Sequence, residues 1–428
     1  MKAIRSIKGT YDLLPADTQR WRFVEAVIHD FMELHGYGEI RTPAFEQTEL
    51  FARGIGQDTD IVSKEMYSWV DQGGTHLTLK PELTAPVVRS LIQHQLMSQS
   101  PIVRLYYLDA LFRRERPQKG RQRQFHQFGI EAFGSIHPEQ DAEIISMAYK
   151  ILLTFGISEL TLRLNTIGST EVRPAYLQLL RSELENHASE LCSTCNSRLE
   201  KNALRVFDCK NESCQKILDQ HAPRIHEHIT PEDRDHFQQV CDLLTSLEVP
   251  YFHDTKLVRG LDYYSRTTFE ITSARLGAQD ALCGGGRYDG LVKELGGPAV
   301  PAIGFAAGIE RILLAISEFD EESDTAADIY LVALGDQARK MGLKIADQLR
   351  REKGLRVTVE TMRRSMKAQL RETNRSGAQF AIILAEEEMK QGQGIVKEME
   401  SGDQFTIPLA EIVTYFQVGH DCGCSDEH

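Results

Sequence analysis

The chain has 428 residues, of which 41% are hydrophobic and 26% charged, and its net charge is −13 at pH 7. This length predicts two or three domains, and the ordinary composition excludes long disordered spans. The negative charge argues against a protein that coats nucleic acid without sequence preference. No stretch approaches the ~18 uncharged apolar residues of a membrane helix, and no apolar segment of signal-peptide length opens the chain. We therefore expect a cytoplasmic location and no membrane partner.

The first predicted element is an amphipathic helix near the N-terminus. Apolar side chains recur at helical spacing from Trp21 to Leu34, after Pro15 and with Asp17 as the candidate N-cap. The segment that follows contains Pro43, which cannot donate a main-chain hydrogen bond. This favours an edge strand or an interface segment there.

Four later segments have the composition and alternation of strands, namely residues 75–86, 102–114, 124–134 and 257–271. Their large and polar side chains alternate as in half-buried strands. Helical patterns lie between them. We therefore predict an α+β domain in which an antiparallel sheet is flanked by helices.

Changes in composition predict the domain boundaries. Residues 170–245 are rich in Glu, His, Asn and Cys and carry helical patterns, which predicts a mainly helical insertion in a sheet domain spanning 1–325. Strand and helix then alternate, which predicts a separate α/β domain over residues 326–418. Residues 419–428 form a short polar tail.

The sequence contains no glycine-rich loop of the kinds that cradle nucleotide phosphates, so any nucleotide must be bound by side chains. In the segment 105–131, Arg113 could pair with a phosphate, Glu115 could accept from an exocyclic amine, and Phe125 could stack on a purine. The alternative interpretation is a charged surface hairpin.

Three further segments are candidates for a site. Glu82 and Thr84 would emerge on one face of an extended segment, suited to an ammonium group, although they could instead cap the following helix. Three consecutive glycines precede Arg287 and Tyr288 and allow close backbone approach, or mark a tight bend. Arg311 lies on an apparently buried helix, where an arginine usually has an anionic or stacking partner.

The cysteines of the insertion form a candidate metal site. Their spacing, C-x₂-C-x₁₃-C-x₄-C, suits tetrahedral zinc, and unligated thiols are the alternative. The residues concerned are Cys192, Cys195, Cys209 and Cys214. The polar tail holds a second group of soft ligands, for which a tail without metal is the alternative: His420, Cys422, Cys424 and His428.

The order of five motifs identifies a resemblance. "RTPAFE", "FRRERPQKGRQRQFHQFGIE" and "GFAAGIER" are similar to motifs 1, 2 and 3 of class II aminoacyl-tRNA synthetases. "RGLDYYSRTTFE" and "GGGRYDGLVKELGG" match two signatures peculiar to the histidine enzymes. The chain therefore resembles the histidyl-tRNA synthetase family from "KGTYDLLP" to the α/β domain, while the cysteine segment is less constrained and the tail lies outside the resemblance.

The resemblance implies a histidine site of nine residues: Glu82, Thr84, Arg113, Gln127, Glu131, Arg259, Tyr263, Tyr264 and Tyr288. Within it, Glu82, Thr84 and Gln127 would bind the α-amino group. Glu131 and Tyr264 would lie on either side of the imidazole, where a carboxylate and a phenol can satisfy its two nitrogens.

The resemblance also implies an ATP site of Arg113, Glu115, Arg121, Phe125 and Arg311. Phe125 and Arg311 would sandwich adenine, with Glu115 on its amino group. Arg113 would bind the α-phosphate, and Arg121 the distal phosphates. Arg113 and Arg259 would be catalytic, because fixed guanidinium groups, with Mg²⁺, stabilise the charge that grows as the histidine carboxylate attacks.

The remaining implied partners are tRNA(His) and a second copy of the chain. The acceptor end of the tRNA would meet Arg116, Gln118, Lys119 and Arg123. The α/β domain would bind the anticodon region, and the span from Arg339 to Arg375 contains twelve basic and four acidic residues. Motif 1 implies a homodimer.

Two positions depart from the family pattern. Lys80 stands where the family generally has arginine, and "DALF", which begins at Asp109, replaces Gly-Pro-Met-Phe. The alternative to an enzyme is the related non-catalytic regulatory subunit of ATP phosphoribosyltransferase, which senses histidine. That relative lacks the C-terminal domain and the catalytic signatures that this chain retains.

Overall fold

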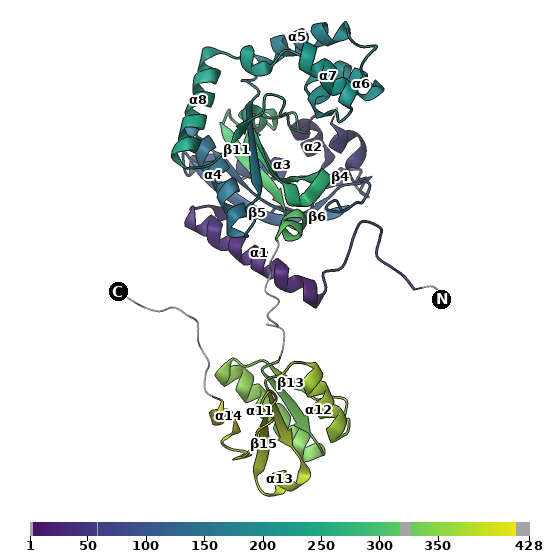
Figure 1. Cartoon of the computed structure of the whole chain (residues 1–428), viewed down its shortest axis with the longest axis vertical. Coiled ribbons are helices and arrows are strands. Elements are labelled where there is room, and N and C mark those ends of the chain that lie inside the picture. The colour runs from purple at the N-terminus through teal and green to yellow at the C-terminus, as the bar shows by residue number, and fades with distance from the viewer. Residues whose placement is uncertain (1–2, 58, 317–326, 417–428) are drawn as a thin grey trace. The chain divides into compact units, whose positions relative to one another are not determined.

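The computed structural model describes residues 3–57, 59–316 and 327–416 (Figure 1). The chain divides into two compact units, Met1–Phe319 and Asp320–His428. The candidate ligands of the tail, His420, Cys422, Cys424 and His428, lie outside the described residues.

The first unit is built on an eight-stranded sheet with the order β1-β5-β6-β11-β10-β9-β7-β8. Its strands are β1 (Gly38–Glu39), β5 (Val103–Phe112), β6 (Gln124–Phe133), β7 (Leu160–Thr166), β8 (Phe252–His253), β9 (Ser265–Ser273), β10 (Ala281–Arg287) and β11 (Ala302–Gly308). Every pair from β5 to β7 is antiparallel, and the short strands β1 and β8 add parallel edges. The predicted antiparallel sheet is confirmed.

Helices cover both faces of this sheet. The core on one face joins the sheet to α1 (Pro15–Leu34), α4 (Pro138–Thr154) and α8 (Pro231–Ser246). The core on the other face contains side chains of α3 (Thr84–Gln93), α9 (Leu291–Glu294) and the helices that follow β7. Alternation along β5 sends Tyr106 into the first core and Tyr107 into the second. The polar cavity described below opens on the second face.

The helices between β7 and β8 include α5 (Arg173–Glu185), α6 (Ser193–Lys201) and α7 (Glu212–His221), which gather at one end of the first unit (Figure 1). The 3₁₀ helix η3 (Ala203–Asp208) joins α6 to the loop before α7. Thr230 caps α8, because its side chain accepts from the backbone N–H of Asp233.

A small sheet, β2-β4-β3, and two helices complete the first unit. Its strands are β2 (Phe45–Gln47), β3 (Ser68–Val70) and β4 (His76–Leu79), and α2 (Thr48–Ile55) and the π-helix η1 (Ile61–Glu65) lie between β2 and β3. The helix α10 (Ile309–Ala315) follows β11 directly. It carries Glu310 and Arg311.

Three local predictions were wrong. Asp17 is not the N-cap of α1; Leu14 is, and the Asp17 carboxylate accepts from the Leu14 N–H at 3.2 Å. Residues 75–86 are not one strand, because β4 ends at Leu79 and α3 begins at Thr84, so Glu82 and Thr84 do not share an extended face. In the segment 257–271, regular strand begins only at Ser265.

The second unit has a five-stranded sheet with the order β13-β12-β14-β15-β16. Its elements are β12 (Ile329–Ala333), α11 (Asp336–Lys353), β13 (Val357–Val359), α12 (Met366–Arg375), β14 (Phe380–Leu384), α13 (Glu386–Lys390), β15 (Gln393–Glu398), β16 (Gln404–Pro408) and α14 (Ile412–Tyr415). The strand–helix alternation to β14 is the predicted one, and it gives three parallel strands. None of the helices described in either unit is long and apolar enough to cross a membrane.

Candidate active site

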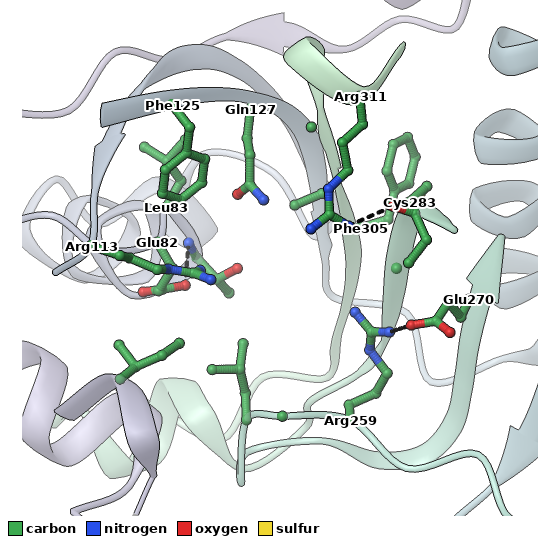
Figure 2. A pocket seen from close by; sticks show the side chains of 18 of the residues that line it. Glu82, Leu83, Arg113, Phe125, Gln127, Arg259, Glu270, Cys283, Phe305 and Arg311 are labelled. Atoms are coloured by element: carbon green, nitrogen blue, oxygen red, sulfur yellow. Dashed lines mark hydrogen bonds and ion pairs between the residues drawn. The ribbon is translucent and has the colours of Figure 1, made fainter. Parts of the chain in front are cut away.

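The residues predicted to bind histidine and ATP lie together around one cavity of about 480 Å³ in the first unit (Figure 2). Those that line it are Glu82, Thr84, Arg113, Glu115, Arg121, Phe125, Gln127, Glu131, Arg259, Tyr263, Tyr264, Tyr288 and Arg311. They come from the start of α3, the loop between β5 and β6, β6 itself, α10 and the loops beside β9 and β10. Segments separated by more than two hundred residues therefore form one polar site.

One end of the cavity is closed around the carboxylate of Glu131 on β6. Its Oε1 accepts a hydrogen bond from the Thr84 hydroxyl at 2.7 Å and one from the Tyr107 hydroxyl at 3.2 Å. Its Oε2 accepts from the hydroxyl of Tyr288. Glu131 is only 1% exposed, so three hydroxyl groups replace the water that a carboxylate would otherwise bind.

The environment of Glu131 perturbs its ionisation. Burial raises the pKa of this carboxyl to about 8, although hydrogen bonds from Tyr288 and Thr84 favour the charged form and oppose the shift. A carboxyl that titrates near neutral pH can meet an imidazole either as an acceptor or as a proton donor. This makes Glu131 the side chain best suited to recognise a titratable nitrogen heterocycle.

Glu82 lies at the start of α3 and caps that helix. Its carboxylate accepts from the backbone N–H groups of Thr84 at 2.8 Å and Ala85 at 2.9 Å. The capping alternative is thus what the structure shows, and the same carboxylate also lines the cavity. Burial raises the pKa of Glu82, although these two backbone hydrogen bonds oppose the shift.

Three tyrosines form the wall beside Glu131. The ring centroid of Tyr263 is 4.8 Å from that of Tyr264 and 5.5 Å from that of Tyr288. It is Tyr288, and not Tyr264, that donates to Glu131. The phenol of Tyr264 therefore remains a prediction as the second partner of a bound imidazole.

Cationic side chains line the rest of the cavity. Arg113 donates from Nε to the carbonyl of Pro81 at 2.9 Å, and its Cζ lies 5.1 Å from the centroid of the Phe125 ring. Arg311 is held by the carbonyl of Ala281 at 2.7 Å. In Figure 2, Arg113 and Phe125 lie on one side of the opening and Arg311 on the other.

The loop between β5 and β6 contributes a cation and an acid. Arg121 donates from Nη1 to Oε2 of Glu115 at 3.3 Å, and both line the cavity. The residues predicted to meet the acceptor end of tRNA do not line it: Arg116, Gln118, Lys119 and Arg123. Arg116, Gln118 and Lys119 are exposed, as an external partner requires.

Arg259 is fixed on the wall opposite Arg113 (Figure 2). Its Nη1 donates to Oε2 of Glu270 on β9 at 2.6 Å. Burial alone would lower the pKa of Arg259, but Glu270 and Tyr264 outweigh it, so the pKa is raised and the group stays charged. The side chain lies over Gly284, where an added Cβ would be 2.0 Å from Nη2.

Gly284 on β10 and Gly304 on β11 line the cavity and form its glycine floor. A Cβ at Gly304 would be 1.9 Å from Oε2 of Glu131, and one at Gly285 would be 2.2 Å from the backbone oxygen of Gly304. These contacts are shorter than van der Waals separation. The close approach predicted for the three consecutive glycines is therefore real, and it leaves room for Arg259 and Glu131.

The two departures from the family pattern lie against each other. The Lys80 side chain is 1% exposed and forms an ion pair with Asp109, and its Nζ also donates to the Thr42 carbonyl at 3.1 Å. Lys80 precedes Pro81, whose carbonyl holds Arg113. The pair thus supports the wall of the cavity from behind.

Sequence reasoning missed Tyr107 and Glu270. Tyr107 faces Gly129 across the β5–β6 pair, and this glycine leaves space for the phenol to reach Glu131. Glu270 faces Gly284 across the β9–β10 pair. Both pairings depend on strand register, so the sequence alone offered no signal for either residue.

Sequence reasoning also missed the role of Arg287. This side chain is fully buried and pairs with Asp141 on α4, which in addition accepts from Thr267 at 2.6 Å. His236 on α8 lies 2.9 Å from the same carboxylate. The network ties α4 and α8 to strands β9 and β10, and Arg287 directly precedes Tyr288.

Comparison with known proteins gives this geometry a context. A family model described as Histidyl-tRNA synthetase matches residues 9–312, and one described as Anticodon binding domain matches residues 328–418. A Histidine--tRNA ligase of Natranaerobius thermophilus is 43% identical over 404 residues, which are 94% of this chain and 96% of the relative. One of Lysinibacillus sphaericus is 45% identical over 413 residues, 95% of this chain and 97% of the relative.

The chain belongs to the histidyl-tRNA synthetase family. The crystal structure of the apo histidyl-tRNA synthetase of S. aureus, a member of this family, is similar with a TM-score of 0.80 and 37% identity, covering 97% of this chain and all of that one. A structure described as an ATP phosphoribosyltransferase regulatory subunit/histidyl-tRNA synthetase, from Bacillus halodurans C, has a TM-score of 0.64 and 21% identity, covering 87% of this chain and 97% of that one. The second likeness concerns the fold alone. The predicted family and fold class are confirmed.

Proposed function

We propose that the chain activates L-histidine with ATP, forming histidyl-adenylate and pyrophosphate, and then transfers the histidyl group to the 3′ end of tRNA(His). The observation that carries the proposal is the buried carboxylate of Glu131, surrounded by hydroxyl groups, in a cavity whose other walls present Arg113 and Arg259. A heterocycle and a polyphosphate are the two ligands that such a division of charge fits. Membership of the family supports the same conclusion.

Histidine binds with its imidazole toward Glu131. One ring nitrogen donates to this carboxylate, and Tyr264 satisfies the other. Glu82, Thr84 and Gln127 receive the α-amino group. A site that hydrogen-bonds both ring nitrogens rejects an apolar ring, because its buried polar groups would then be left unpaired.

ATP occupies the more open part of the cavity. Adenine lies between Phe125 and Arg311, and its amino group donates to Glu115. Arg113 contacts the α-phosphate, and Arg121 contacts the distal phosphates. An Arg121 bound in this way exchanges its ion pair with Glu115 for one with phosphate.

The reaction is an in-line displacement at the α-phosphorus. A carboxylate oxygen of histidine forms a bond to phosphorus, the bond to the β-phosphate bridging oxygen breaks, and pyrophosphate leaves with the electron pair. Arg113 and Arg259 approach from opposite walls and stabilise the charge on the non-bridging oxygens. Because Arg259 is already held by Glu270, little reorganisation is needed at the transition state.

Mg²⁺ accompanies ATP as the ion that neutralises phosphate charge. One or two of the carboxylates that line the cavity, such as Glu65 or Glu115, would suffice to hold it, because Mg²⁺ takes its other ligands from phosphate oxygens and water.

The tRNA binds outside the cavity. The exposed residues Arg116, Gln118 and Lys119, with Arg123, meet the acceptor end, whose terminal ribose hydroxyl attacks the histidyl carbonyl and releases AMP. The second unit, which matches an anticodon-binding domain, presents exposed cations such as Lys344 on α11. These can contact the phosphate backbone. We also infer a cytoplasmic location for the reaction, as expected for a synthetase that charges tRNA for protein synthesis.

A homodimer completes the proposal. Phe45 on β2 is 49% exposed, and its ring lies 5.9 Å from that of Trp69 on β3, which is 40% exposed. Val70 beside them is 55% exposed. Apolar side chains gathered on a small sheet next to motif 1 fit an interface between two copies. Light scattering at micromolar concentration should give twice the chain mass, and a monomer would contradict the dimer.

Histidine-dependent exchange between ATP and labelled pyrophosphate tests the function. Histidine should support exchange, and each of the other amino acids should give the rate of buffer alone. A regulatory subunit would bind histidine without exchange, so histidine binding measured by calorimetry together with no exchange would favour that alternative. Charging of a tRNA(His) transcript tests the second step.

A further inference from the structure

The insertion contains a cluster of thiols that the reaction does not use. Cys192 is the N-cap of α6, and Cys195 lies in its first turn, whereas Cys209 ends η3 and Cys214 lies in the first turn of α7. All four are free thiols, and their Sγ atoms lie within 4.8 Å of one another. Within residues 3–57, 59–316 and 327–416, no other three or more His, Cys, Asp or Glu side chains come close enough to hold an ion.

The spacing of these sulfurs matches a tetrahedral metal site. Cys192 Sγ and Cys209 Sγ are 3.9 Å apart. In a tetrahedron with Zn–S bonds of ~2.3 Å, neighbouring sulfurs are about 3.8 Å apart. Two backbone N–H groups already point at sulfur, Cys192 N at Cys214 Sγ (3.2 Å) and Asn211 N at Cys209 Sγ (3.5 Å). Such hydrogen bonds stabilise thiolates, the form that binds metal.

We propose that Cys192, Cys195, Cys209 and Cys214 bind one structural Zn²⁺ ion, which fixes the segment between the two cysteine pairs against the wall of the active site. The site is closed, because four protein sulfurs complete the tetrahedron and leave no position for a substrate. Cys195 and Cys214 are fully buried in the same hydrophobic core as the cavity tyrosines.

The segment between the cysteine pairs reaches the candidate active site. Asn202 donates from Nδ2 to Oδ1 of Asp262 at 2.5 Å, and Asp262 directly precedes Tyr263. Arg205 lies 3.7 Å from the Asp60 carboxylate and donates to Asp208 at 3.1 Å. Arg205, Asp208 and Asp60 all line the cavity. An ion that joins both ends of this segment would therefore hold part of the cavity wall in place.

Metal content tests the site independently of activity. Full-length protein purified without chelators should contain about one zinc per chain by mass spectrometry of the metal. Cys195→Ser and Cys214→Ser should each reduce it well below half. Cys241→Ser, which changes a buried thiol on α8 outside the cluster, and the double variant Cys422→Ser/Cys424→Ser in the tail should retain it. The proposal would be overturned if the wild type held less than half an equivalent of zinc or held iron in its place. It would also be overturned if only the tail variant lost its zinc.

Cobalt substitution covers the case in which the serine variants do not fold. Wild-type protein stripped of metal and titrated with Co²⁺ should develop the strong thiolate-to-cobalt absorption of a tetrahedral Cys₄ site, saturating at one equivalent. The absence of this absorption overturns the site even if no variant can be purified.

The kinetic consequence rests on the proposed function. Chelator-treated enzyme should show a histidine KM raised about five-fold or more, a size typical of coupling between sites, with a smaller change in kcat, and added Zn²⁺ should restore it. One zinc per chain with an unchanged histidine KM after removal would leave the metal site standing and overturn its coupling to the cavity. Metal binding without any exchange activity would contradict the proposed function alone.

Discussion

The substitution Gly284→Ala tests whether the position of Arg259, and not only its charge, controls activation. An added Cβ would lie 2.0 Å from Nη2 and 2.4 Å from Cζ of Arg259. An ordinary contact needs at least 3.4 Å, so the guanidinium must move by about 1.4 Å. Misplacement of a reacting or stabilising group by ~1 Å can cost about 10²-fold in rate. We expect histidine-dependent pyrophosphate exchange to fall by about 10- to 100-fold.

A double-mutant cycle decides whether the loss passes through Arg259. Arg259→Ala alone should reduce exchange by ~10²-fold or more while histidine binding remains measurable. If Gly284→Ala acts by displacing the guanidinium, combining it with Arg259→Ala should cost little more. Gly290→Ala is the matched control, because the nearest atom to its added Cβ is 3.6 Å away, and it should leave exchange within about two-fold. Additive losses in the double variant, or full activity in Gly284→Ala, would refute this reasoning.

Glu131→Gln should raise the histidine KM by about ten-fold or more, because an amide cannot become the carboxylate to which the imidazole is proposed to donate; steady-state exchange would measure this. It should also change the pH dependence of stability. Because its pKa is raised to about 8, folded Glu131 keeps a proton that the unfolded chain loses above the ordinary value of 4.5. The free energy of unfolding of ligand-free wild type, measured by urea denaturation, should therefore fall as the pH rises between these two values. The Glu131→Gln variant should lack this pH dependence. Asp109→Asn should lower the free energy of unfolding by about 2 kcal/mol, which is less than for a fully buried pair because Asp109 is 29% exposed. Adding Lys80→Met should recover most of this stability, and no recovery would show that the ion pair is not the cause. Asp141→Asn should cost about 3 kcal/mol or more in the same assay, since it leaves the Arg287 guanidinium buried without its anion. Burial opposes ionisation of Asp141, but Arg287 and His236 outweigh burial and lower the pKa of this carboxyl. The stabilisation should therefore be present in wild type at neutral pH and be lost as the pH falls through the acid range. An Asp141→Asn variant as stable as wild type at pH 7 would contradict this prediction.

The sequence was most informative where a motif and a regular strand coincide. Phe125, Gln127 and Glu131 are separated by two and then four positions along β6, so the alternation of a strand alone places them on one face. The order of the family motifs along the chain then indicated which other segments contribute residues to the same site. Periodicity could not show that Glu82 ends a loop and caps α3, because a capping carboxylate and a strand residue leave the same short polar pattern.

Long-range pairing was not predictable from one sequence. Lys80 and Asp109 were recognised separately as departures, but only the fold shows that β4 and β5 bring them into one ion pair. The same holds for Arg287, whose acidic partner Asp141 is 146 residues away on α4. Such pairs depend on packing between elements, which neither propensity nor spacing encodes.

The glycine floor limits how the cavity can change by mutation. At Gly284 and Gly304 a single added carbon would collide with Arg259 or with Glu131. An inhibitor that rests on this floor would therefore contact positions at which resistance substitutions also damage the groups proposed to bind histidine and ATP. Selection for resistance should instead yield changes at lining residues to which the proposed function gives no role, such as Ile61 and Gln122.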